Sequence, residues 1–267
     1  MIEAYKKFIK RFNKEDDIPF SCPTCARQTL VWDDECWHQY QTALSKKEQK
    51  ECDEFEPEWT RYIFSGVLKC VHHKCGDKVI VCGEGTIEEN YTDYILTEEG
   101  YCPCEREFID VFTPRYFQPA LNLFKVPDKV PSEIKDIIYE SFALTLSSPS
   151  SAVNKLRIAI EILLTEFGIQ GKDRKGAFVS LDQRIKSIEQ NHILFPQQQL
   201  LLAIKWLGNS GSHEENAIFI DELFDAFQII EKLLNNLYSY DRILEMAQLI
   251  SQKKQPLTRK ERAELKK

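Results

Sequence analysis

The cysteines of this chain are confined to its first part. All nine lie between Cys22 and Cys104, and none follows in the remainder of the 267 residues. Cysteine-rich regions are typical of small modules that are held together by a metal ion or by disulfides. A region without cysteines must be stabilised by its own hydrophobic core. The distribution of the cysteines therefore predicts a first part that is cross-linked by a bound metal ion and a second part that needs no such cross-link.

Two closely spaced cysteine pairs predict the metal ligands. They are Cys22-Pro-Thr-Cys25 and Cys70-Val-His-His-Lys-Cys75. Each pair supplies two thiolates from one tight loop, and two such loops can close around a tetrahedral ion. Four soft thiolates in a closed set favour a structural Zn²⁺ with no open position for a substrate. Two alternatives stay open: His72 or His73 replaces one thiolate, or the cysteines are small buried hydrophobes.

The other five cysteines do not form a second clear motif. One residue between two cysteines is a poor spacing for a zinc knuckle, so a second metal site is the weaker interpretation. We expect these side chains to act mainly as small apolar residues. They are Cys36, Cys52, Cys82, Cys102 and Cys104.

Charge and hydropathy exclude several classes of protein. Residues 1–119 carry 15 Lys+Arg against 23 Asp+Glu, and residues 120–267 carry 20 against 19, which together give the net charge of -7. Neither part is basic enough to indicate nucleic-acid binding by charge alone. There is no signal-peptide pattern and no apolar run long enough for a membrane span. An odd number of cysteines without an export signal predicts reduced thiols and a cytoplasmic protein.

The sequence predicts an α+β chain with four successive regions. A zinc-ribbon-like domain covers residues 1–110 and includes a charged surface insertion at 45–58. A connector rich in prolines and aromatics follows at 111–131, and we expect it to pack in extended form. A helical bundle covers 132–250, and a basic tail covers 251–267.

Hydrophobic periodicity places the elements within these regions. We expect a short helix in the first fourteen residues, strands at 28–32, 62–69 and 78–82, and a hairpin at the second cysteine pair. Apolar stripes and capping residues predict five helices. They cover residues 132–146, 150–167, 181–188, 196–207 and 221–250.

One polar cluster in the helical part could carry chemistry. Lys205, Asn209 and His213 lie within nine residues. They are residue types of a metal-independent nuclease: histidine can move a proton, while lysine and asparagine can stabilise phosphate charge. The alternative is that Gly208 and Gly211 end a helix in a turn, where Asn209 and His213 satisfy backbone groups.

A second polar pair lies on the expected second helix of the bundle. Arg157 and Glu161 are four residues apart, so both lie on one face. An ion pair within or on the bundle is the simpler interpretation. A functional role requires that they face the segment from Asn209 to His213.

Two stretches resemble a bacterial family catalogued as domain-of-unknown-function family 4145. They are residues 148–161, SPSSAVNKLRIAIE, and residues 203–213, AIKWLGNSGSH. The resemblance extends over about residues 110–240, and a zinc-ribbon-like region is a familiar companion of it. The family is similar to the HEPN superfamily of helical bundles, many of which dimerise and act as RNases in antiviral and toxin systems. Asn209 and His213 match the polar residue and the histidine of that superfamily's signature, but Gly208 stands where arginine is usual.

The resemblance implies two functions from different classes. The first is a cytoplasmic protein of defence against phage or mobile DNA, a homodimer that binds RNA or a nucleotide through its helical bundle. In that case it could act as a metal-independent endoribonuclease. His213 would be the general acid/base, Asn209 would position the phosphate, Lys205 would neutralise it, and Arg157 and Glu161 would support the site. The second is a non-catalytic, dimerising adaptor that docks a partner effector. A zinc-dependent hydrolase is a weaker third reading.

Overall fold

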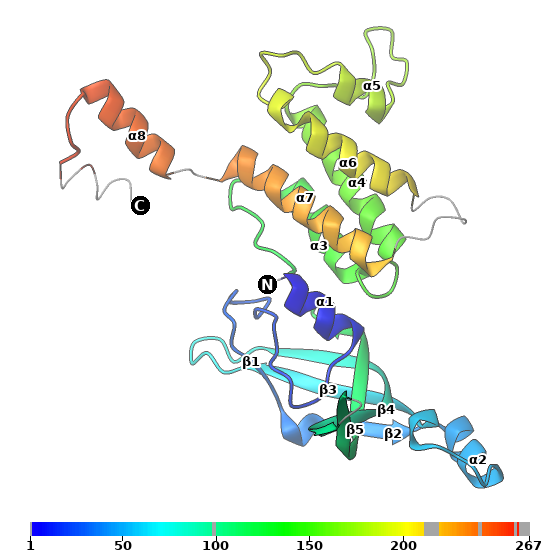
Figure 1. The fold of residues 1–267 in the computed structure, drawn as a ribbon. Helices are drawn as coiled ribbons and strands as arrows, with labels where there is room; N and C mark the ends of the chain where they lie inside the picture. Colours follow the sequence, from blue (N-terminus) through cyan, green and yellow to red (C-terminus); the bar gives the residue numbers. More distant parts are fainter. Residues whose placement is uncertain (1, 98–99, 211–218, 240–241, 259–260, 262–267) are drawn as a thin grey trace.

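The computed structural model describes the backbone of residues 2–97, 100–210, 219–239, 242–258 and 261. An antiparallel sheet forms the first part, and helices form the second, as Figure 1 shows. The predicted α+β class, with strands before helices, is therefore confirmed. Within the described residues, no helix combines the length and the apolar character needed to cross a bilayer.

The first part is a five-stranded antiparallel sheet with helix α1 packed on one face. The strand order is β1-β3-β4-β5, and β2 also pairs with β3. The elements are α1 (Ile2–Lys10), β1 (Leu30–Trp32), the 3₁₀ turn η1 (Asp34–Cys36), β2 (His38–Gln41), α2 (Ala43–Glu51), the 3₁₀ turn η2 (Pro57–Trp59), β3 (Arg61–Cys70), β4 (Lys78–Thr97) and β5 (Gly100–Gln118).

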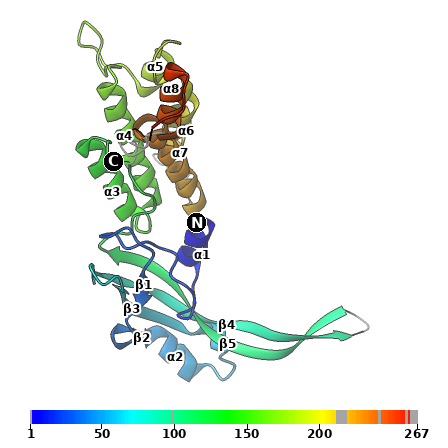
Figure 2. The same ribbon diagram turned by 90° about the vertical axis from the view of Figure 1, so that its left-hand side faces the viewer.

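The strands β4 and β5 continue well beyond the rest of the sheet. The pairing of β3 with β4 ends at Arg61 and Thr86, while β4 and β5 remain paired as far as Thr97 and Gly100. The outer half of this hairpin is therefore a two-stranded ribbon that projects from the domain (Figure 2). Sequence periodicity predicts strand only at 78–82, and the longer ladder is a structural finding.

An aromatic cluster fills the space between α1 and the sheet. Phe8 and Phe12 stack with ring centroids 4.3 Å apart, and Phe12 also contacts Phe64 and Phe112. Phe12 and Phe112 exchange both backbone hydrogen bonds, which ties the segment after α1 to β5. Since each buried aromatic contributes roughly 2–3 kcal/mol, this cluster is the main core of the first part.

The second part is a bundle in which α4 lies in the centre. It contacts α3, α5, α6 and α7, and its apolar stripe from Val153 to Leu164 is buried. The elements are α3 (Ser132–Leu144), α4 (Pro149–Glu166), α5 (Leu181–Lys186), the 3₁₀ turn η3 (Phe195–Gln197), α6 (Gln198–Ser210), α7 (Ile220–Tyr238) and α8 (Arg242–Lys253).

Three boundaries differ from those that the sequence predicts. The expected helix over 221–250 is two helices, because Ser239 takes an extended conformation after α7 and its hydroxyl donates to Asn235. The connector expected from 111 begins later, because residues up to Gln118 belong to β5. The charged surface insertion expected to begin at 45 lies partly in helix α2, which begins earlier, at Ala43, because Thr42 accepts a hydrogen bond from the backbone of Ser45 and caps the helix.

The connector and α1 join the two parts. The connector is packed, since Leu121, Leu123, Phe124 and Val126 are all buried. Phe124 contacts Phe142 of α3 edge-on at 5.0 Å between ring centroids. On the other side, Nζ of Lys10 on α1 lies 2.7 Å from a carboxylate oxygen of Asp221 on α7. The junction between the sheet and the bundle thus has an apolar centre and a charged rim.

Candidate functional site

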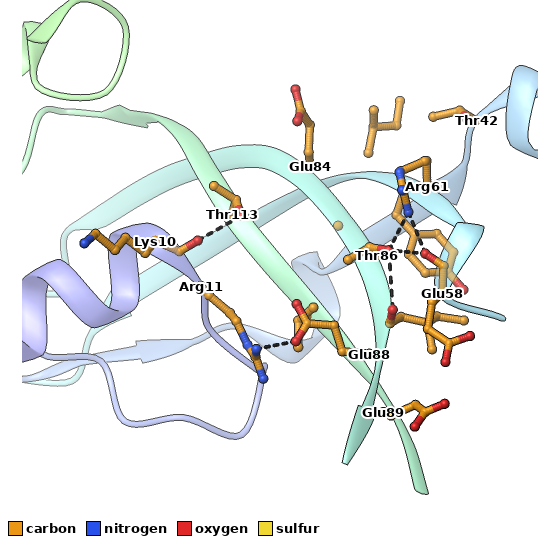
Figure 3. Close-up of a pocket in the computed structure, with 15 residues that line it drawn as sticks. Lys10, Arg11, Thr42, Glu58, Arg61, Glu84, Thr86, Glu88, Glu89 and Thr113 are labelled. Atoms are coloured by element: carbon orange, nitrogen blue, oxygen red, sulfur yellow. Dashed lines mark hydrogen bonds and ion pairs between the residues drawn. The ribbon is translucent and has the colours of Figure 1, made fainter. Parts of the chain in front are cut away.

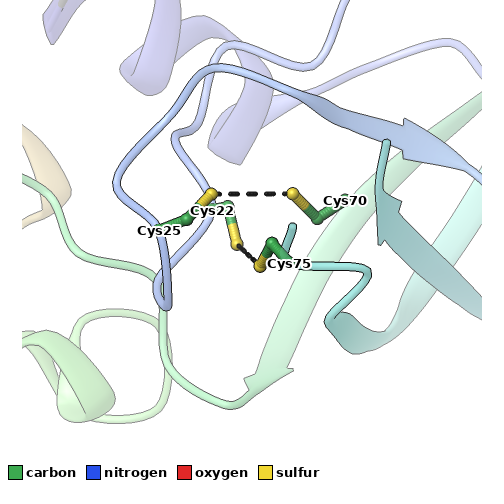
Figure 4. Close-up of side chains that lie close together, drawn as sticks. All are labelled: Cys22, Cys25, Cys70 and Cys75. Atoms are coloured by element: carbon green, nitrogen blue, oxygen red, sulfur yellow. Dashed lines mark hydrogen bonds between the residues drawn. The ribbon is translucent and has the colours of Figure 1, made fainter. Parts of the chain in front are cut away.

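Four cysteine sulfurs meet at one end of the sheet. Sγ of Cys22 lies 3.8 Å from that of Cys75, and Sγ of Cys25 lies 3.7 Å from that of Cys70. The four sulfurs all lie within 4.8 Å of one another, as Figure 4 shows. These distances are far longer than a disulfide of about 2.05 Å. The arrangement is compatible with a metal site, as the two predicted pairs require.

The backbone around both pairs has the turn that brings two sulfurs to one side. Ala26 and Gly76, each directly after the second cysteine of its pair, have positive φ angles of 56° and 67°. The N–H of Ala26 donates to the carbonyl of Cys22, and the N–H of Cys75 donates to that of His72, each at 2.8 Å. Glycine adopts this left-handed conformation without strain, and Ala26 adopts it at some cost.

Polar neighbours hold the two cysteine loops together. The Thr24 hydroxyl of the first loop donates to the Asp77 carboxylate of the second. Thr29 Oγ1 lies 3.1 Å from Sγ of Cys70, and this hydrogen bond is the largest of the causes that lower the pKa of Cys70 to about 6. Burial raises the pKa of Cys22 and of Cys75, so without a metal ion Cys70 is the thiol of the cluster that most readily forms the thiolate. Sequence reasoning missed Thr24, Thr29 and Asp77, although each lies within four residues of a predicted ligand.

The alternative ligands do not join this cluster. Among the described residues, the four cysteines are the one group with a spacing suited to a metal ion. His72 and His73 contact each other, with ring centroids 4.9 Å apart. Cys36, Cys52 and Cys82 are free and lie apart from the four. The side chains of Cys102 and Cys104 lie outside the described residues.

Lys205, the predicted phosphate-neutralising residue, is engaged inside the bundle. It is only 6% exposed, and its Nζ donates to Asp182 of α5 at 2.6 Å. The same Nζ lies 3.5 Å from the centre of the Trp206 ring. Hydrogen bonds from Lys186 and then from Lys205 lower the pKa of Asp182. A lysine held in this way links α6 to α5.

Arg157 and Glu161 form the ion pair that their spacing predicts. Nη2 of Arg157 lies 3.3 Å from a carboxylate oxygen of Glu161. A Cβ added at Gly208 would lie 2.9 Å from Cβ of Arg157, so α4 and α6 approach closely at this point. Arg157 therefore packs beside the residue that precedes Asn209. Asn209 is half-buried near the end of α6, whereas His213 lies outside the described residues.

The sheet of the first part also carries a large groove. It has a volume of about 850 Å³, and residues of α1, β3, β4 and β5 line it (Figure 3). Its charged side chains are already paired: Arg11 contacts Glu88, Arg115 contacts Glu84 at its border, and Arg61 donates to Thr86 at 2.8 Å. A ligand here would compete with these internal partners.

Two family comparisons match separate parts of the chain. Residues 140–266 match the family described as Domain of unknown function (DUF4145), and residues 10–117 match the one described as Domain of unknown function (DUF8608). The predicted resemblance to family 4145 is therefore confirmed, over a segment that lies further along the chain than the expected 110–240. Neither a curated protein nor a solved structure matches the chain.

Proposed function

We propose that Cys22, Cys25, Cys70 and Cys75 bind one Zn²⁺ and that this ion is structural. A zinc–sulfur bond of about 2.3 Å places the sulfurs of a tetrahedral site about 3.8 Å apart. The sulfur separations of 3.8 and 3.7 Å agree with that value. Four thiolates complete the coordination, so the ion would cross-link the loop before β1 to the β3–β4 turn, as in a zinc ribbon.

Metal analysis of the purified chain tests the zinc site. We expect one zinc per chain by plasma mass spectrometry, and loss of most of it in Cys25→Ser. Cys36→Ser is the matched control, because Cys36 is a free cysteine outside the cluster. Full zinc content in Cys25→Ser, or none in the wild type, would contradict the assignment.

For the whole protein, we propose a non-catalytic adaptor that docks a partner rather than transforming a substrate. The observation that carries this is the ion pair of the buried Lys205 with the half-buried Asp182, which removes the predicted phosphate-binding cation from a nuclease site. A closed four-sulfur site likewise leaves no position for a substrate. The ion pair and the four-cysteine site would therefore stabilise the fold rather than act on a substrate.

The surface around α2 supports docking of a basic partner. Glu51, Asp53, Glu54 and Glu56 are exposed, and Trp59 close by is 45% exposed. Acidic residues around an exposed aromatic form a surface that complements a basic partner with an apolar pocket. In Figure 1, α2 lies on the side of the sheet away from the bundle, which leaves it accessible.

An RNA-cleavage assay separates the adaptor from the nuclease. Zinc-loaded wild type and His213→Ala are incubated with labelled cellular RNA in EDTA, and their zinc content is measured before and after. We expect no cleavage by either protein. Cleavage by the wild type that disappears in His213→Ala would overturn the adaptor proposal.

One observation favours RNA or nucleotide binding by a HEPN-like bundle as the second candidate. The aliphatic part of Arg157 packs against Gly208, the residue before Asn209, while its guanidinium pairs with Glu161. In that case Asn209 and Arg157 would contact phosphate and His213 would move the proton. Weaker RNA binding by Arg157→Gln than by Lys155→Gln, an α4 lysine that contacts Glu140, would support it. The expected homodimer is tested on the same samples by sedimentation velocity.

A further inference from the structure

A second hollow lies where the first cysteine loop meets the bundle. It has a volume of about 680 Å³, within the range of small-ligand pockets. Its walls come from α1, the first cysteine loop, the connector, α3 and α7, and we call it the junction cleft. Figure 1 shows α1 at this junction between the sheet and the bundle.

Asn122 of the junction cleft donates to the carbonyl of Pro23, but four other polar side chains of the cleft have no hydrogen-bond or ion-pair partner among the described residues. Tyr5 is only 2% exposed, and its hydroxyl forms no hydrogen bond with another described residue. The carboxylates of Glu231 and Asp128 and the ammonium of Lys125 also form no ion pair within the described part of the chain. Buried polar groups are usually satisfied by protein or by water, so the Tyr5 hydroxyl, which lines the cleft, is available to a molecule that binds there.

Glu231 and Tyr5 both line the junction cleft, one from α7 and the other from α1. Burial raises the pKa of Glu231, and burial followed by the Glu231 charge raises the pKa of Tyr5. An N–H donor with a positive charge would relieve the desolvation of the carboxylate, whereas an anion would increase the repulsion. Gln228 lies three residues earlier on α7, so it is on the same face and also lines the cleft.

The other residues that line the cleft indicate which shape and charge of ligand it can accommodate. Leu123, Phe124 and Val126 are buried and supply an apolar floor, and Tyr139 is 41% exposed at the edge. Two carboxylates against one lysine give the cleft a negative balance. A flat apolar body with a cationic nitrogen group fits this combination of floor and rim.

We propose that the junction cleft binds a small planar organic cation, whose N–H groups donate to the carboxylate of Glu231 while its ring lies against the apolar floor. Tyr5 donates its hydroxyl hydrogen to a second polar atom of the ligand, or accepts one from it. The lining of the site includes the first cysteine loop but neither the α2 surface nor the segment around Asn209, so the proposal does not depend on the adaptor function proposed above.

Benzamidine is a suitable probe, because it joins a planar ring to an amidinium group. Binding to the zinc-loaded full chain is followed by ligand-detected NMR and titration, with benzoate as the anionic counterpart. We expect benzamidine to bind and benzoate not to bind. Glu231→Gln should weaken binding at least about tenfold, since a charge-assisted hydrogen bond is lost, and Tyr5→Phe should weaken it about fivefold.

Two controls separate loss of the site from loss of the fold. Glu133→Gln changes an exposed carboxylate of α3 outside the cleft, and it should bind like the wild type. Circular dichroism and zinc content establish that each variant is folded. Equal binding of benzamidine to folded Glu231→Gln and wild type would overturn the proposal. Absence of binding at the highest soluble concentration, or equally tight binding of benzoate, would also overturn it.

Discussion

At the scale of single residues, two buried cations show how this bundle uses charge. Arg184 is 5% exposed and donates to the carbonyl of Glu161 within α4 and to that of Ile169, which follows the helix. Lys205 is similarly buried and pairs with Asp182. Buried cations of this kind are stable only when they are fully hydrogen-bonded. Sequence reasoning selected Lys205 for its chemistry, because nothing local in the sequence shows a partner 23 residues away.

The two lysines that share Asp182 should differ in their contribution to stability. Lys205→Ala should lower the free energy of unfolding by about 1–2 kcal/mol, because it removes the buried partner of a carboxylate. Lys186→Ala removes a 68% exposed partner of the same carboxylate. It should change the free energy of unfolding by about 0.5 kcal/mol or less. Urea denaturation followed by circular dichroism measures both. Equal losses of unfolding free energy in the two variants would show that the burial of Lys205 does not determine its contribution to stability.

The Asp182 pair should also weaken in acid. The pKa of Asp182 is lowered in the folded protein, so its pairing stabilises the fold above the unfolded pKa of about 3.9. This contribution is lost as the pH falls through the lower, folded pKa. The stability difference between the wild type and Lys205→Ala should therefore shrink as the pH falls below about 4. A difference that stays constant from neutral pH to acid would contradict this account.

At the scale of elements, the contact between α4 and α6 depends on a glycine. Gly208 is buried, and the side chain of Arg157 occupies the space where a Cβ would lie. The same packing accounts for glycine at this position. A large residue at 208 would separate α4 from α6, so the close packing of these two helices requires the smallest side chain.

Substitution of Gly208 should be unfavourable even though alanine is the better helix former. Gly208→Ala gains about 1 kcal/mol of helix propensity but forces its Cβ against Cβ of Arg157, and overpacking costs about 1–3 kcal/mol. We expect a net loss of stability in thermal unfolding. Gly171→Ala is the control, since its added Cβ would lie 3.6 Å from the nearest atom. A more stable Gly208→Ala would show that the helices move apart without cost.

The elements that sequence predicts well are those whose signals are local. Apolar stripes and caps locate α3, α4, α5 and α6 within a few residues, and the cysteine spacings identify the two loops. The long β4–β5 ribbon is not predicted: beyond Thr86 the described strands β4 and β5 pair with each other alone, so no third strand of the sheet fixes a common inward face there. The break after α7 is likewise invisible to periodicity, since the apolar stripe continues across it.

At the scale of the whole molecule, the sheet and the bundle meet along α1 and the connector. The buried residues of the two parts form one continuous hydrophobic core. The proposed metal cross-link lies in the first part alone, because all four cysteines precede β4. Sequence predicts this division from the cysteine distribution, but the junction cleft is formed by five separate segments, and no linear pattern reveals it.

Metal removal should therefore affect the two parts unequally. We expect Cys25→Ser to increase amide hydrogen exchange in β1 and β3 strongly, because the loop before β1 loses its cross-link. Exchange in α4 and α7 should change much less. Hydrogen-exchange mass spectrometry of wild type, Cys25→Ser and the control Cys36→Ser measures this. Equal loss of protection in both parts would show that they unfold as one unit.

The first cysteine loop has two neighbours at once. Cys22 and Pro23 line the junction cleft, and the side-chain amide of Asn122 in the connector donates to the carbonyl of Pro23 at 3.1 Å. If occupation of the cleft favours the loop geometry that the metal also favours, each event increases the affinity of the other by the same factor. Such reciprocity would couple the two binding sites, so that the fraction of chains with an occupied cleft would rise with the amount of metal available.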